Sequence, residues 1–176
     1  MGRPPRNFEL DAVYHLTSHG VDDRPIFRDD VDRQLFALRL LRIATRFEWV
    51  LFAACLMDTH HHLVLRGPEI SSGMKALNGG HSQAFNARHG RRGALFESRF
   101  ADRVIRGEEH LEAAVQYVEW NPVSAGIVDR PEDWPWSTHA GSPLRSLLAP
   151  VLPTPYERGT FPCRSGSIVC STSEPP

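Results

Sequence analysis

Three consecutive histidines, His60, His61 and His62, interrupt an apolar run near the middle of the chain. The apolar residues on both sides indicate a buried strand, and side chains on a strand alternate between its two faces. His60 and His62 should therefore project together, while His61 points the other way. Because imidazole is the commonest metal-binding side chain, this pair could hold one metal ion. The pattern predicts metal-assisted chemistry, which needs a nucleophile from elsewhere in the chain.

A helix expected over residues 108–120 supplies that nucleophile. Tyr117 and Asn121 are four residues apart, so they share one face of the helix. A phenol can act as a covalent nucleophile, although its reference pKa of about 10 keeps it protonated at neutral pH. A nearby metal ion would polarise a scissile phosphate and stabilise the charge that develops on it. Asn121 could add an oxygen ligand to His60 and His62, which gives a site suited to Mg²⁺ or, more tightly, Mn²⁺.

The elements that position these residues follow from periodicity and turn signals. Strands are predicted over residues 13–17, 47–57, 60–65 and 94–105, and helices over 29–46, 71–89 and 108–120. In the first helix, Val31, Leu35, Leu38 and Leu41 recur at helical spacing and predict its core-facing stripe. This order predicts an α+β fold, a ferredoxin-like split βαβ sandwich. Its antiparallel sheet should have about four strands, with helices on one face.

Length and composition predict one globular domain with tails. The chain has 176 residues, of which 41% are hydrophobic and 23% charged, which is ordinary for a globular protein. We expect a flexible arm over residues 1–10, a domain that carries the site over 11–140, and a disordered tail over 141–176. No apolar stretch has the length of a membrane span and no signal peptide is evident, so a cytoplasmic location without membrane contact is expected.

Positive charge is concentrated between His81 and Arg106, where six arginines stand against two acids. The arginines are Arg88, Arg91, Arg92, Arg99, Arg103 and Arg106. Such a cluster could grip the backbone phosphates of DNA, because the guanidinium group suits bidentate phosphate contacts. A GC-rich genome would also favour arginine, and a charge run is commonly just a solvated face.

Several motifs, taken in order, resemble one family. They are YHLTSHG (14–20), PIFRDD (25–30), MDTHHHLVL (57–65), NARHGRRGALFESRF (86–100), YVEWNPVSAGIV (117–128) and DWPWST (133–138). Together they resemble the HUH single-tyrosine transposases, where HUH stands for histidine, hydrophobic residue, histidine. Within that group, the chain is most similar to the REP-associated tyrosine transposases of bacteria, over roughly residues 10–140.

The resemblance implies a role for each candidate residue. His60 and His62 correspond to the metal-binding pair, and Asn121 to a polar residue that completes the metal site. Tyr117 corresponds to the nucleophile that forms a 5′-phosphotyrosine bond with DNA. The implied activity is metal-dependent cleavage of single-stranded DNA beside a hairpin, followed by strand transfer. His61 departs from the pattern, since an aliphatic residue is expected there, and a buried imidazole needs a polar partner.

Two other functions remain open at this stage. Taken alone, each feature has a structural interpretation, because histidine pairs on strands and tyrosines on amphipathic helices are often part of the packing. A domesticated, non-catalytic relative would recognise hairpin DNA in a salt-sensitive way without cleaving it. An unrelated ferredoxin-like protein would bind metal but not DNA. The sequence does not decide between a monomer and a homodimer.

Overall fold

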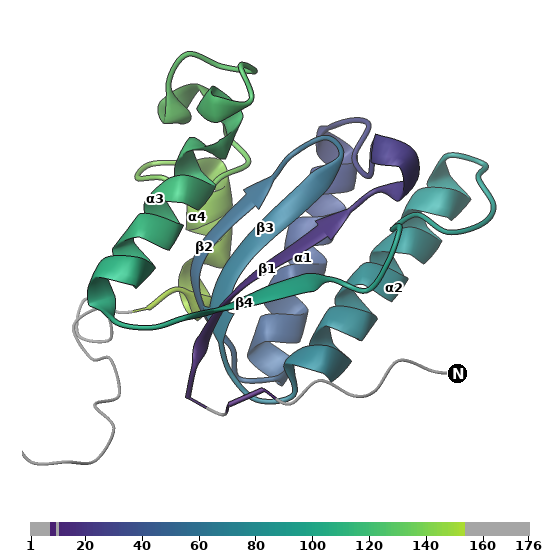
Figure 1. Ribbon diagram of the computed structural model, residues 1–176. Helices are drawn as coiled ribbons and strands as arrows, with labels where there is room; N and C mark the ends of the chain where they lie inside the picture. The colour runs from purple at the N-terminus through teal and green to yellow at the C-terminus, as the bar shows by residue number, and fades with distance from the viewer. Residues whose placement is uncertain (1–7, 10, 154–176) are drawn as a thin grey trace, which may run out of the picture.

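The computed structural model describes residues 8–9 and 11–153, and at its centre is a four-stranded sheet. The strands are β1 (Val13–His19), β2 (Val50–Leu56), β3 (His60–Arg66) and β4 (Ala101–Ile105). Their order across the sheet is β2-β3-β1-β4, and every neighbouring pair is antiparallel (Figure 1). The predicted α+β class and antiparallel sheet are confirmed.

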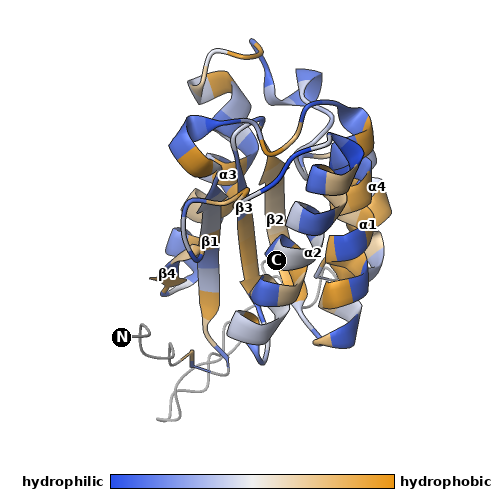
Figure 2. Cartoon of the chain, turned by 90° about the vertical axis from the view of Figure 1, so that its right-hand side faces the viewer, coloured by the Kyte–Doolittle hydropathy of each residue, from blue (hydrophilic) through white to orange (hydrophobic). Residues whose placement is uncertain are grey.

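The helices cover both faces of this sheet rather than one. They are α1 (Asp30–Arg46), α2 (Ile70–Arg88), α3 (Glu108–Ser124) and the short α4 (Pro143–Leu148). Leu63 and Leu65 of β3 pack into the core with α1, α2 and α4, whereas Val64 packs with α3 on the opposite face. Figure 2 shows apolar strands with α1 and α2 on one side and α3 on the other. The expectation of helices on one face is corrected, because β2 has buried apolar residues on both of its faces. Leu51, Ala54 and Leu56 pack on the α1 and α2 side, and Phe52, Ala53 and Cys55 pack on the α3 side.

The first helix turns a different face inward from the one its leucine spacing predicts. Asp29 caps α1 by accepting a hydrogen bond from the backbone N–H of Asp32, 3.1 Å away. Val31, Leu35 and Leu38 are 46%, 42% and 48% exposed, so they are not the core stripe. The buried face instead carries Phe36, Ala37, Leu40, Ile43 and Ala44. Both faces have apolar residues at helical spacing, and the aromatic ring of Phe36 lies on the face that packs inward.

Both ends of the described chain pack on the domain. Phe8 lies edge-on against Tyr14 with ring centroids 4.8 Å apart, so the expected arm is packed at this residue. Residues 1–7 and 10 lie outside the described residues. At the other end, Leu144 and Leu148 of α4 and Val151 are buried beside α1. The expectation of a tail without order is corrected for residues 141–153, whereas residues 154–176 lie outside the described part.

Helix α4 begins where capping chemistry allows it. Ser142 accepts a hydrogen bond from the backbone N–H of Arg145, 3.0 Å away, and Pro143 occupies the first turn. The four-residue spacing of Leu144 and Leu148 then buries both side chains. Within residues 8–9 and 11–153, no helix is long and apolar enough to cross a membrane.

Candidate active site

The histidine triplet is divided between the two faces of the sheet, as the strand alternation predicts. The rings of His60 and His62 lie on the α3 face with their centroids 4.9 Å apart. His61 is fully buried on the opposite face, against Phe36. Strand β1 lies beside the pair, with Thr17 opposite His62 in the ladder.

Two side chains of β1 contact the ring of His62 through one of its nitrogens. Its Nδ1 lies 2.9 Å from Nε2 of His15 and 3.2 Å from Oγ1 of Thr17. Its Nε2 is buried and has no hydrogen-bond partner among the described residues. Burial, reinforced by the neighbouring His60 and His15, lowers the pKa of His62 to about 2. The imidazole is therefore neutral at physiological pH, which is its ligating form.

His60 lies in a similar polar setting, two residues before His62 on β3. Its Nδ1 is 3.1 Å from Oγ1 of Thr59, its ring stacks on His19, and Asn121 lines the same cleft. Burial, together with the nearby His19, lowers the pKa of His60, so this ring is also neutral. Asn121 is 9% exposed and faces the sheet from α3.

Tyr117 completes the arrangement from α3, one turn before Asn121. Its ring lies edge-on to His15 and to His62, with centroid separations of 5.8 Å in both cases. These residues line an open cleft of about 580 Å³ between β1, β3, β4 and α3. Tyr117 is 53% exposed, so its side chain borders both the cleft and the solvent. The structure thus brings the four predicted metal and catalytic residues into one cleft.

The residues that could hold a metal ion are His60, His62 and Asn121. Among residues 8–9 and 11–153, no group of three His, Cys, Asp or Glu side chains is arranged as a metal site. The unpartnered Nε2 of His62 nevertheless fits a ligand atom, since metal-bound histidines usually hydrogen-bond through their other nitrogen. Two imidazole nitrogens and an amide oxygen make an incomplete donor set, which leaves positions for substrate oxygens.

Three site residues on β1 had no predicted role. His15, Thr17 and His19 all face the cleft. The signal was available, because residues two apart on a strand share a face. What the sequence could not show is that β1 pairs with β3, so that these side chains meet His60 and His62.

The six predicted DNA-binding arginines have different surroundings. Arg103, on β4, lines the cleft, and Arg106 lies 3.3 Å from Glu9. Arg91 lies over the Phe85 ring, and Arg92 and Arg99 are exposed in the loop before β4. Arg88 pairs with two carboxylates at the start of α1.

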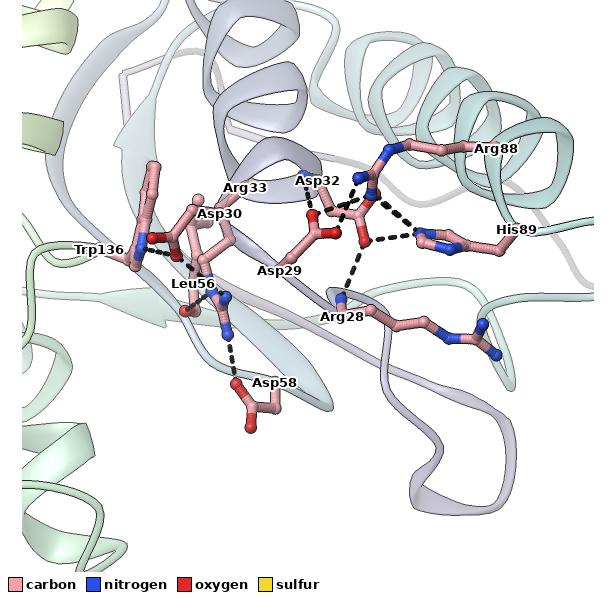
Figure 3. A network of polar contacts seen from close by, with 10 residues as sticks. All are labelled: Arg28, Asp29, Asp30, Asp32, Arg33, Leu56, Asp58, Arg88, His89 and Trp136. Atoms are coloured by element: carbon pink, nitrogen blue, oxygen red, sulfur yellow. Dashed lines mark hydrogen bonds and ion pairs between the residues drawn. The ribbon is translucent and has the colours of Figure 1, made fainter.

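Arg88 ties the end of α2 to the start of α1 (Figure 3). Its guanidinium donates to Asp29 and to Asp32, with N–O distances of 2.7 Å to each carboxylate. Asp32 is 2% exposed and also accepts from the backbone N–H of Arg28 and from Nε2 of His89. These carboxylates fix the guanidinium of Arg88 between the two helices, and contact of Arg88 with DNA stays a prediction.

This network predicts a loss of stability in acid. Hydrogen bonds from Arg88 lower the pKa of Asp29 to about 2. Burial raises the pKa of Asp32, but hydrogen bonds from Arg28, His89 and Arg88 outweigh it and leave the pKa lowered. A carboxyl whose pKa is lower in the folded state stabilises the fold at pH values above its unfolded pKa of ~4. This contribution disappears as the pH falls to the folded pKa.

Urea unfolding of Arg88→Gln tests this prediction. Between those two pH values, its free energy of unfolding should fall less steeply than that of the wild type. Arg92→Gln should keep the wild-type slope, and equal slopes for Arg88→Gln and wild type would contradict the prediction.

Comparison with known proteins identifies the class. Residues 10–121 match the family model described as "Transposase IS200 like". Since the match covers more than half of the chain, the protein belongs to the IS200-like transposase family. Among curated proteins, none matches the chain significantly.

Two solved structures are similar to the chain. One is a REP-associated tyrosine transposase bound to a REP hairpin, with a TM-score of 0.66 and 18% identity over 96% of this chain and 100% of the other. Another is a candidate transposase from Deinococcus radiodurans R1, with a TM-score of 0.46 and 21% identity over 67% of this chain and 96% of that one. At this level of identity, the first similarity shows the fold.

Proposed function

We propose that this protein is a metal-dependent endonuclease and strand transferase that acts on single-stranded DNA beside a hairpin. The observation that carries the proposal is the packing of Tyr117 against His62 across a cleft that also contains His60 and Asn121. Membership of a transposase family supports DNA as the substrate. The hairpin is suggested by the similar structure, whose own ligand is a REP hairpin.

The proposed step uses Tyr117 as the nucleophile. Its phenolic oxygen attacks a backbone phosphorus, the bond from phosphorus to the 3′ oxygen breaks, and a 5′-phosphotyrosine forms. The phenol loses its proton and the departing 3′ oxygen gains one, so the DNA is left with a free 3′-OH. His60, His62 and Asn121 would hold Mg²⁺ or Mn²⁺, which when bound polarises the phosphate and stabilises the negative charge of the transition state.

The proposed DNA path runs over the β4 side of the cleft. Arg103 lines the cleft there and is the best placed of the six arginines to contact a phosphate near Tyr117. The exposed Arg92 and Arg99 could extend that contact along the backbone. The neutral imidazoles beside a tyrosine argue against a non-catalytic relative that only binds DNA, because binding alone does not require them.

Covalent capture of DNA tests this proposal. Purified protein is incubated with a labelled oligonucleotide that carries a hairpin and a single-stranded flank, in Mn²⁺, Mg²⁺ or EDTA. We expect a denaturation-resistant protein–DNA adduct with either metal and none in EDTA, with the attached nucleotide on the Tyr117 peptide. A scrambled oligonucleotide that forms no hairpin is the control. Salt-sensitive binding without an adduct would contradict catalysis and favour the non-catalytic relative.

A further inference from the structure

A buried polar cluster lies directly behind the candidate active site, on the opposite face of the sheet. Nε2 of His61 lies 3.1 Å from Oδ1 of Asn78, and Nδ2 of Asn78 donates to Oγ of Ser18 over 2.8 Å. His61 is 0% and Ser18 is 2% exposed. The amide of Asn78, a residue of α2, thus contacts two strands at once: it accepts from His61 on β3 and donates to Ser18 on β1.

The position of this cluster in the ladder connects it to the site. Ser18 and His61 are directly paired across β1 and β3. Thr17 and His19 flank Ser18, and His60 and His62 flank His61, with all four flanking side chains on the cleft side. The Asn78 bridge therefore joins the two strands at the pair of residues that lies between the site residues. A slip of one residue in either strand would exchange its two faces and remove those side chains from the cleft.

The surroundings of His61 disfavour a buried polar ring, which suggests that its hydrogen bond to Asn78 has a role. The ring lies in an apolar setting, with the rings of Phe36 and Phe96 at centroid distances of 4.8 Å and 6.0 Å. Its Nδ1 has no hydrogen-bond partner in the part of the chain that the structure describes. An aliphatic side chain would fill this space without an unsatisfied nitrogen, whereas His61 adds a directional bond to Asn78.

We propose that Asn78 is a positioning residue that acts through His61 and Ser18 to lock the register of β1 against β3. The lock fixes the spacing between the β1 side chains and the pair formed by His60 and His62. Groups that hold metal ligands in place affect metal affinity without touching the metal. Asn78 would act on His60 and His62 in this way, through the backbone of the two strands. The link to catalysis rests on the proposed function of the cleft, but the lock itself is a property of the sheet.

The test compares Asn78→Leu with Asn86→Leu, which removes an asparagine from the same helix. Asn86 donates to the carbonyl oxygen of Gly93 in the following loop and contacts neither strand through that bond. In Asn78→Leu, we expect amide hydrogen exchange at residues 17–19 and 60–62 to accelerate by about tenfold, because two hydrogen bonds are lost. The Mn²⁺ dissociation constant from calorimetry should rise by about 10- to 100-fold. Asn86→Leu should leave both measurements near their wild-type values.

A second variant separates positioning from simple packing. In His61→Leu/Asn78→Leu, His61 and Asn78 both become apolar and only the Ser18 hydroxyl loses its donor, so the melting temperature should recover in part. We expect the Mn²⁺ affinity to stay reduced, because the directional bridge is still missing. Wild-type Mn²⁺ affinity in this double variant would overturn the proposal. Exchange in Asn78→Leu that is unchanged, or that accelerates uniformly over the whole sheet, would also overturn it. If the wild type binds no Mn²⁺, the proposed metal site fails, but the exchange comparison still decides the register lock.

Discussion

Tyr117→Phe is expected to reduce the rate of covalent adduct formation by about a thousandfold or more, since it removes the attacking oxygen. The substitution deletes one atom from a side chain that is 53% exposed. The ring contacts with His15 and His62 do not need the hydroxyl, so the cleft should keep its shape. Hairpin binding, measured by fluorescence anisotropy, should therefore stay within about twofold of the wild type.

Tyr14→Phe provides a matched control. Tyr14 is buried on the α1 and α2 face, where its hydroxyl accepts a hydrogen bond from the backbone N–H of Glu9 over 2.8 Å. This variant loses the same atom on the other face of the sheet from the cleft, and it should form the adduct at the wild-type rate. An adduct that persists in Tyr117→Phe would show that another side chain is the nucleophile.

His62→Ala is expected to weaken Mn²⁺ binding by more than about 100-fold. Removing an outer partner of a ligand alone costs about 10- to 100-fold, and this change removes a ligand itself. The buried, unpartnered Nε2 identifies the atom that is lost. Calorimetric titration with Mn²⁺ measures the change, and adduct formation should fall with it.

The control for this substitution is His110→Ala. His110 also lines the cleft, from the first turn of α3, but it is exposed and lies outside the proposed ligand set. Its loss should change the Mn²⁺ dissociation constant by less than about threefold. Equal effects of the two substitutions would contradict the assignment of His62 and point to a diffuse effect of charge in the cleft.

The strand alternation of the histidine triplet could be predicted from the sequence because it depends on local geometry alone. The spacing of Tyr117 and Asn121 on one helix face is local in the same sense. The prediction that Tyr117 and Asn121 meet His60 and His62 depended on the family resemblance, because no periodicity indicates which face of the sheet α3 covers. The structure places α3 on the cleft side, opposite α1 and α2.

The sequence was least informative where two local patterns competed or where a partner was distant in the sequence. Helix α1 has apolar residues at helical spacing on two faces, and Leu35 lies on the exposed one while Leu40 is buried. The ion pairs of Arg88 were not predicted, because its acidic partners, Asp29 and Asp32, are more than fifty residues away. Neither the buried face of α1 nor the ion pairs of Arg88 follow from a short stretch of sequence, because tertiary packing decides both.

The half-exposed position of Tyr117 bears on the fate of any DNA strand joined to it. A phosphotyrosine bond at the rim of an open cleft stays accessible from solvent. An incoming 3′-OH could therefore attack its phosphorus without any opening of the domain's core. Water has the same access. On the proposed mechanism, strand joining and hydrolysis then compete for one intermediate. The arrival time of the second DNA end would decide between insertion and a broken strand.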